Sequence, residues 1–268
     1  TGDHRLEDVF DDVKDGDFAL LSMDPLRHFF DKEKMQKPTH ARSGPDWSSF
    51  CSNWMTQWER FNDKEYENKI RTGVEDLKKL PLQLSSGPDF EYDPADSHLY
   101  YIGERTNGGN HLQICMGAAQ TWLELGDLLE DDEWKKMMAD FGRFYYMSQE
   151  ERKKASDGLI GERIGSLPFM AAAMGAYGAA YYKDETLARK TWQILMRVIM
   201  SDTKKDGFAE TPVLDAGNQE TLHEVSWITT NFTSQWCLNV IMVLEFIREA
   251  LPKTMKELDR LMEGFPMT

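Results

Sequence analysis

The chain has 268 residues, of which 41% are hydrophobic, and its formal net charge at pH 7 is −15. This length can bury a substantial core, and the negative charge disfavours nucleic acid and anionic membrane surfaces as partners. No apolar run in the sequence approaches the about 20 residues that a membrane-spanning helix needs.

Most of the chain has the apolar spacing of helices, and two kinds of helix alternate along it. In Asp63–Leu80, the side chains of Tyr66, Ile70, Val74 and Leu77 recur on one face, so this helix is amphipathic. Helices of the second kind carry few charges before their last turn, and we expect them to be covered on most sides. In chain order the predicted helices are one that starts near Asp3, then Pro45–Phe61, Asp63–Leu80, Asn110–Leu129, Asp131–Met147, Ser166–Tyr182, Asp184–Ser201 and Thr230–Ala250.

An acidic residue stands where each amphipathic helix begins. The four starts lie near Asp3, Asp63, Asp132 and Asp184. An aspartate at a helix start can accept hydrogen bonds from the first backbone N–H groups, which have no partner within the helix. The recurrence of this signal along the chain indicates stacked helical hairpins.

The alternation of interior and amphipathic helices predicts an all-α fold. Two concentric layers of antiparallel helices, as in an α/α toroid, satisfy the pattern, and a plain stack of hairpins, an α-solenoid, is the alternative. We expect an incomplete toroid of four to five hairpins, since a closed six-hairpin toroid needs more chain. We expect residues 1–268 to form a single domain, with the C-terminal part of a larger protein as an open alternative.

Long connections separate several of these helices. Residues 90–103 alternate in polarity around Asp93-Pro94, which predicts a small β-hairpin in a long loop. Long ordered connections in a compact domain are often functional. All four connections lead into interior helices, so we expect a cleft at that end of the bundle; they are residues 15–44, 80–109, 156–166 and 202–229.

The first connection contains the stretch KPTHARSGPDW. Its functional interpretation is a rim that binds an anion or a sugar, with His40 and Arg42 as polar groups and Trp47 as a stacking surface. The alternative is a loop with ordinary solvated charge.

The second connection ends in GERTNGGNH, just after Tyr101. Two glycines let the backbone come close to a ligand, and Arg105 and Asn107 stand beside them. Asn110 suits a helix N-cap, which is also its simplest explanation. His111 in the first turn faces the positive end of the helix dipole, which favours a neutral imidazole that can act as a base. A hydrogen-bonded structural histidine is the alternative.

The third and fourth connections add further polar candidates. Glu162 and Arg163 are candidates for substrate binding, although a local surface ion pair is their simpler explanation. The fourth connection carries the mixture of carboxylate, imidazole and indole groups that a carbohydrate site uses: Glu210, Glu220, His223 and Trp227.

Other chemistries have little support in the sequence. It has no phosphate loop and no GxGxxG, GxSxG or HExxH motif, and no cysteine spacing suggests zinc. We therefore expect neither a metal nor a cofactor. Each of the three cysteines, Cys51, Cys115 and Cys237, falls in a predicted interior helix, so we expect buried thiols.

Three stretches between Ser43 and Leu129 resemble a known family. They are SGPDWSSFCSNWMTQWERFNDKEY, LQLSSGPDFEYDP and GGNHLQICMGAAQTWLELGDLL. They are similar to the helical catalytic domain of rhamnogalacturonan exolyase-type polysaccharide lyases. The resemblance implies an α/α toroid flanked by β-sandwich domains, and these β-sandwich domains are absent from this sequence.

The resemblance implies β-elimination beside a uronic acid. That reaction needs a polar group that stabilises the sugar carboxylate, a base that takes the C5 proton, and an acid that protonates the leaving oxygen. Candidates for the polar group are Arg42, Arg105 and Asn110. Candidates for the base are His111, His40 and His223. Tyr101 is the candidate acid, unless one residue performs both proton transfers.

Three functional hypotheses remain open. The first is a secreted or periplasmic polysaccharide lyase that acts on a pectic, rhamnogalacturonan-like glycan. The second is a glycoside hydrolase on the same toroid, with Glu210 and Glu220 as its two carboxylates. The third is a non-catalytic helical domain that binds a polysaccharide or braces a partner domain.

Overall fold

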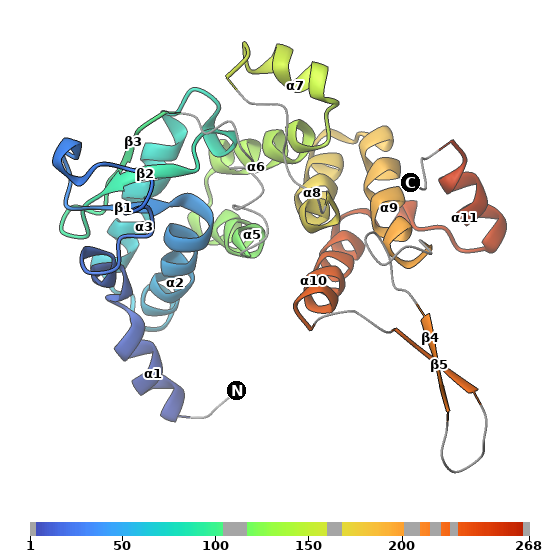
Figure 1. Cartoon of the computed structure of the whole chain (residues 1–268), viewed down its shortest axis with the longest axis horizontal. Helices are drawn as coiled ribbons and strands as arrows, with labels where there is room; N and C mark the ends of the chain where they lie inside the picture. The colour runs from blue at the N-terminus through green and yellow to red at the C-terminus, as the bar shows by residue number, and fades with distance from the viewer. Residues whose placement is uncertain are drawn as a thin grey trace. The chain divides into compact units, whose positions relative to one another are not determined.

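The computed structural model describes residues 4–103, 117–159, 168–200, 210–214, 221–225 and 230–264. These residues form two compact units, Thr1–Gly165 and Ser166–Thr268, which we name unit 1 and unit 2 (Figure 1). Each unit is described by itself. The single domain expected for residues 1–268 stays a prediction.

Unit 1 is built from helical hairpins around buried tryptophans. Trp47, Trp54, Trp122 and Trp134 are all fully buried. The indole N–H of Trp122 donates to Ser48 Oγ at 3.0 Å, so a polar contact also fixes the core. The α-helices described in this unit are α1 Arg5–Val13, α2 Ser49–Phe61, α3 Lys64–Lys78, α5 Ala118–Leu129, α6 Asp132–Tyr145 and α7 Gln149–Ala155.

The sequence signals for these helices are largely confirmed. The four apolar residues predicted on one face of α3, Tyr66, Ile70, Val74 and Leu77, are all buried. Helix α2 is preceded by a π-helical turn, η3 Ser43–Ser48, so the predicted interior helix begins irregularly.

Two of the four predicted aspartate caps are found at the predicted residue. Asp63 accepts from Glu65 N–H, and Asp184 accepts from Leu187 N–H. The cap of α6 is Asp131, one residue before the predicted Asp132, because only Asp131 precedes the first helical turn. Asp3 lies outside the described residues.

Asp131 links the start of α6 to α3. Its carboxylate accepts from the backbone N–H groups of Glu133 and Trp134 and pairs with the Lys78 ammonium. Burial raises the pKa of Asp131, but the hydrogen bonds from Lys78 and from the helix N–H groups outweigh it and lower that pKa below its usual value. The charged carboxylate is therefore favoured in the folded protein.

We expect Asp131→Asn to remove part of the acid sensitivity of unfolding. Because the pKa of Asp131 is lower in the folded protein, its charge stabilises the fold at pH values above the unfolded-state pKa of 3.8. This stabilisation is lost as the pH falls through the folded-state pKa. Asparagine can still cap the helix but carries no charge, so the free energy of unfolding at pH 7 should fall by about 1 kcal/mol or less. Urea unfolding at pH 7 and at about pH 3 checks this. A difference between wild type and variant that does not shrink at low pH contradicts it.

A three-stranded antiparallel sheet lies beside these helices. Its strands are β1 Thr39–Arg42, β2 Asp89–Tyr92 and β3 Leu99–Tyr101, in the order β1-β2-β3. Strands β2 and β3 confirm the predicted hairpin. Strand β1 was expected to be loop, since its four residues are too few to show a strand pattern and its partner lies about 50 residues away in the sequence.

A buried ion pair fixes the first connection to this sheet. Asp17, in the 3-10 helix η1 Gly16–Leu21, is fully buried, and its carboxylate lies 3.2 Å from Lys69 Nζ of α3. Tyr92 of β2 donates its hydroxyl hydrogen to Asp17 at 2.9 Å. The Lys69 ammonium also lies 5.3 Å from the Trp54 ring. Three elements that are distant in sequence therefore share one buried charge pair.

Unit 2 packs three long helices and a shorter one. They are α8 Ala172–Tyr182, α9 Glu185–Met200, α10 Thr230–Ile247 and α11 Met255–Met262. The small residues of α8 allow close approach to α9 and α10, as predicted, and Ala173 N–H donates to Asn239 Oδ1 at 2.9 Å. Strands β4 Glu210–Leu214 and β5 Thr221–Val225 form a hairpin in the connection expected to be loop.

Helix α10 departs from the prediction of an interior helix. Cys51 is buried as expected, whereas Cys237 of α10 is exposed, so the prediction for Cys237 was wrong. Leu238 and Ile241 on the same helix are exposed too, because no described neighbour covers that side. Cys115 lies outside the described residues. Among the helices that the structure describes, none is long and apolar enough to cross a membrane.

Candidate functional site

The three-stranded sheet has one apolar and one polar face. Residues that are directly paired across strands lie on the same face, and faces alternate along each strand. The apolar side carries Thr39, Ala41, Phe90, Tyr92, Leu99 and Tyr101. The polar side carries His40, Arg42, Asp89, Glu91 and Tyr100. The His, Arg, Asp and Glu side chains of the sheet therefore share one face with Tyr100, whereas Tyr92 and Tyr101 lie on the other face.

One end of the sheet holds one described residue from each of two predicted clusters. Strands β1 and β3 run in the same direction because each pairs antiparallel with β2. Arg42 and Tyr101, the last residues of β1 and β3, therefore lie at the same end, together with Asp89 at the start of β2. Past this end the chain continues from Tyr101 into residues 104–116. Four predicted site residues of that segment lie outside the described residues: Arg105, Asn107, Asn110 and His111.

Arg42 is held by a fork of hydrogen bonds. Its Nε and a terminal guanidinium nitrogen donate to the two oxygens of Asp46 at 2.8 and 3.0 Å. The hydrogen bond with Asp46 raises the pKa of Arg42, which burial opposes, and the charge of buried Asp89 raises it further. The guanidinium is partly exposed and stays charged, so it can attract an anionic ligand group that competes with Asp46.

His40 and Trp47 do not present their rings to solvent. His40 is buried, its Nδ1 lies 2.8 Å from Asp24 Oδ2, and the Phe30 ring packs on it with centroids 4.9 Å apart. Trp47 is fully buried against Gly73, where an added Cβ would collide with the indole. In this structure Trp47 is not available as a stacking surface for a sugar, and His40 is not available to a ligand.

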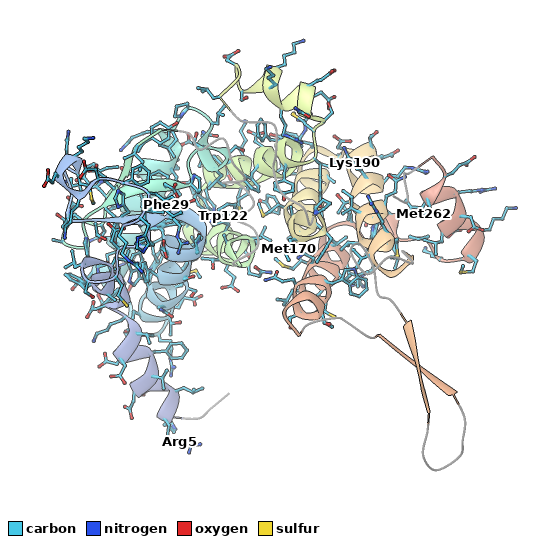
Figure 2. All side chains as sticks on the ribbon, in the orientation of Figure 1. Arg5, Phe29, Trp122, Met170, Lys190 and Met262 are labelled. Atoms are coloured by element: carbon cyan, nitrogen blue, oxygen red, sulfur yellow. The ribbon has the colours of Figure 1, made fainter. Side chains whose placement is uncertain are left out.

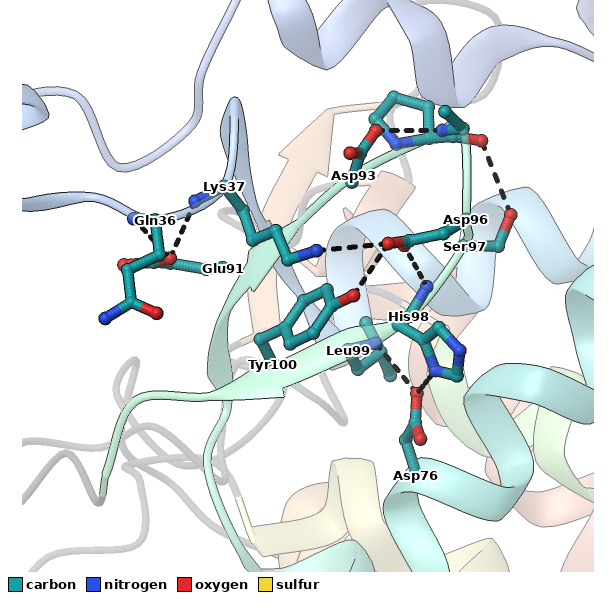
Figure 3. Close-up of polar contacts among 12 residues, drawn as sticks. Gln36, Lys37, Asp76, Glu91, Asp93, Asp96, Ser97, His98, Leu99 and Tyr100 are labelled. Atoms are coloured by element: carbon teal, nitrogen blue, oxygen red, sulfur yellow. Dashed lines mark hydrogen bonds and ion pairs between the residues drawn. The ribbon is translucent and has the colours of Figure 1, made fainter.

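A cluster of polar side chains surrounds the turn between β2 and β3 (Figure 3). Lys37 Nζ lies 3.1 Å from Asp96 Oδ2 and 3.8 Å from the centre of the Tyr100 ring. Tyr100 donates its hydroxyl hydrogen to Asp96 at 2.6 Å. Burial raises the pKa of Asp96, but the hydrogen bonds from Tyr100, His98 N–H and Lys37 lower it overall.

His98 completes this cluster with a carboxylate partner. Its Nδ1 lies 2.8 Å from Asp76 Oδ2, and the same oxygen accepts from Leu99 N–H. Because a carboxylate only accepts hydrogen bonds, we assign the proton to Nδ1, which leaves Nε2 as a lone-pair acceptor on a half-exposed ring. His98 and Asp76 were missed. The alternation of His98 with Tyr100 in a predicted strand could have revealed the histidine, but nothing in the sequence marked Asp76, 22 residues earlier.

The remaining predicted residues belong to the third and fourth connections. Glu210 lies in β4 opposite Val225, and His223 lies in β5 opposite Pro212. Only the backbone of these two strands is described. Glu162, Arg163, Glu220 and Trp227 lie outside the described residues. Within the described part of the chain, no group of three or more His, Cys, Asp or Glu side chains is arranged to hold a metal.

Unit 2 has a pocket whose lining includes none of the predicted site residues. It has a volume of about 840 Å³ and lies between the α8–α9 turn, the end of α10 and helix α11. Its charged lining is balanced, with four cations, Lys183, Arg189, Lys253 and Arg260, and four carboxylates, Asp184, Glu185, Glu249 and Glu257. We assign no ligand to this pocket, because neither sign of charge dominates and the chemistry described above lies elsewhere.

Comparison with known proteins adds evidence independent of this geometry. The family model described as the PcRGLX-like protein C-terminal alpha/alpha toroid domain matches residues 1–252. The chain is 47% identical over 256 residues to the protein named "Uncharacterized protein YetA" of Bacillus subtilis. That alignment covers 94% of this chain and 29% of the relative, so the chain spans less than a third of the relative's length. The family match confirms the α/α toroid assignment.

Proposed function

Because the chain belongs to the family of PcRGLX-like C-terminal α/α toroid domains, we propose that it is the toroid domain of a polysaccharide lyase. Its substrate is a uronic-acid-containing glycan of the pectic, rhamnogalacturonan-like type, and the reaction is β-elimination. Membership in a rhamnogalacturonan lyase-like family is the observation that carries this proposal. A polymer of this kind is met outside the cytoplasm, so we propose a secreted or periplasmic location.

The reaction assigns distinct tasks to the end of the sheet. A base removes the C5 proton of the uronic acid, the electrons form a C4=C5 double bond, and the C4–oxygen bond breaks. Arg42 supports this scheme as the cation that stabilises the sugar carboxylate while negative charge develops. Tyr101 lies at the same end of the sheet as Arg42 but on its opposite face, so it is the proposed proton donor for a leaving oxygen that extends past this end. His111 of the adjoining segment is the proposed base. Arg105 and Asn110 are proposed to assist Arg42.

The hairpin turn supplies a proposed binding surface for the neighbouring sugars. Asp96 and Lys37 form a carboxylate–ammonium pair that can exchange hydrogen bonds with sugar hydroxyl groups, and His98 Nε2 can accept another. Tyr100 lies on the same face of the sheet as Arg42, in register with His40, which precedes Arg42 by two residues in β1. A glycan that follows this face would therefore contact the turn and Arg42 together.

Product analysis on rhamnogalacturonan tests this function. The assay compares the full-length Bacillus subtilis relative with this chain alone, and the expected result is ultraviolet absorbance from an unsaturated uronic acid. New reducing ends without that absorbance would favour the glycoside hydrolase. If the full-length relative gives unsaturated product and this chain alone does not, the chain needs the residues that precede it in its relatives. An enzyme that is active only through residues outside the toroid would support the bracing role and overturn the assignment of catalysis to this domain.

A further inference from the structure

Helix α1 carries a complete apolar stripe. Leu6, Val9, Phe10 and Val13 have the i, i+3, i+4, i+7 spacing of one helix face. The other positions are mostly acidic and include Glu7, Asp8, Asp11 and Asp12. A helix with this pattern normally buries its apolar side against a neighbour.

None of the α1 residues is buried. Val9 is 53% exposed, and Leu6 is exposed as well. The contacts that hold this region are near the end of the helix, where Gln57 donates to the Phe10 carbonyl and the Trp54 indole donates to the Lys14 carbonyl. In Figure 2 the side chains of α1 project around the helix, with Arg5 at its outer end.

Exposed apolar side chains are also frequent in the sequence that follows α1. Seven of the fourteen large hydrophobic side chains that are exposed among the described residues lie within residues 6–30. The seven are Leu6, Val9, Phe18, Leu21, Met23, Phe29 and Phe30, which we name the N-terminal apolar surface. Half of the exposed large hydrophobic groups are therefore concentrated in about a tenth of the chain, whereas scattered single groups would need no explanation.

Helix α3 has the same apolar spacing as α1 but buries its apolar face. Its apolar residues, such as Ile70 and Val74, are buried against the unit. A nine-residue helix such as α1 has little stability on its own and depends on a packing partner. Leu6 and Val9 are thus the exposed positions of the stripe, whereas Phe10 and Val13 are half-buried where α1 contacts α2.

We propose that the N-terminal apolar surface is the docking face for the residues that precede the toroid domain in longer members of the family. The matching family is described as a C-terminal domain, and the chain corresponds to only 29% of the length of its relative. The acidic residues that flank the stripe fit a partner patch that is apolar at its centre and basic at its rim. This inference does not depend on the reaction proposed above.

Hydrogen exchange followed by mass spectrometry tests the proposal with two proteins. One is this chain, and the other is the full-length Bacillus subtilis relative. In each protein the exchange of the α1 segment is compared with that of the α3 segment, which serves as an internal standard of a packed helix. We expect α1 to exchange much faster than α3 in this chain, and the two segments to be similarly protected in the full-length relative.

Substitutions in this chain provide the matched control. Leu6→Gln with Val9→Gln should leave the unfolding temperature unchanged, whereas Ile70→Gln should lower it strongly, because only Ile70 is buried. Protection of α1 in this chain alone would mean that the chain covers the surface itself. Fast exchange of α1 in the full-length relative, or a dimer of this chain that the double variant abolishes, would also overturn the proposal.

Discussion

Lys69→Met is expected to destabilise unit 1 by about 3–5 kcal/mol, because it leaves the Asp17 carboxylate buried without its cation. Asp17 is fully buried, and the Tyr92 hydroxyl would be the remaining side-chain hydrogen-bond donor described for it. Urea unfolding followed by tryptophan fluorescence measures the effect. The buried tryptophans Trp54 and Trp47 make unit 1 visible in that signal.

The loss should depend on pH in a defined direction. Burial raises the pKa of Asp17 above its usual value even with Lys69 present, and removal of Lys69 raises it further. A raised carboxyl pKa gives stability that is present below the unfolded-state value and lost as the pH rises through the folded-state value. Lys69→Met should therefore cost less at about pH 4 than at pH 7, since the carboxyl group can then bind a proton.

Two further variants show whether the buried charge is the cause. Asp17→Asn combined with Lys69→Met removes both charges and should recover much of the loss. Lys136→Met breaks the exposed pair with Asp140 and should cost less than about 0.5 kcal/mol. If Lys69→Met costs no more than Lys136→Met, the ion pair does not hold the first connection in place.

Arg42→Gln is expected to lower kcat/KM of the active enzyme on its glycan by about 100- to 1000-fold, the range for loss of one preorganised group that stabilises transition-state charge. Glutamine keeps some hydrogen-bonding capacity but removes the cation that we propose stabilises the sugar carboxylate. The kcat/KM of Arg42→Lys should lie between that of the wild type and that of Arg42→Gln, because an ammonium group keeps the charge without the planar fork that pairs with Asp46.

Arg71 provides the matched control for this experiment. Its Nε donates to Glu67 at 2.8 Å across one helical turn, which repeats the Arg42–Asp46 distance on the outer side of α3. Arg71→Gln should leave both turnover and unfolding temperature nearly unchanged. Wild-type turnover in Arg42→Gln, with the unfolding temperature preserved, would remove Arg42 from the proposed machinery.

The features predicted correctly from sequence are those whose causes lie within a few residues. Asp63 caps α3 through the N–H group two residues later, and the face of Tyr66 and Ile70 follows from helical spacing alone. The β2–β3 hairpin has its turn signal between its strands. Each of these patterns is complete within one segment of sequence.

The features that were missed depend on partners far away in the chain. Strand β1 forms because β2 pairs with it. The buried Lys69 has its charge partner in Asp17, which lies 52 residues earlier in the sequence. His98 gains its partner from α3, and Cys237 is exposed because no described neighbour covers that side of α10. Local periodicity carries no information about such pairings. For the same reason the sheet register was needed to place Arg42 and Tyr101 at the same end of the sheet.

The mass of the products from rhamnogalacturonan directly tests whether the reaction is elimination or hydrolysis. Elimination breaks the glycosidic bond without adding water, so the fragment with the new double bond is lighter than the corresponding hydrolysis product by one water molecule. We expect this lighter fragment from the active wild-type protein, and much less of it from the Arg42→Gln variant. Fragments that all carry the added water would contradict a lyase and assign the toroid to hydrolysis.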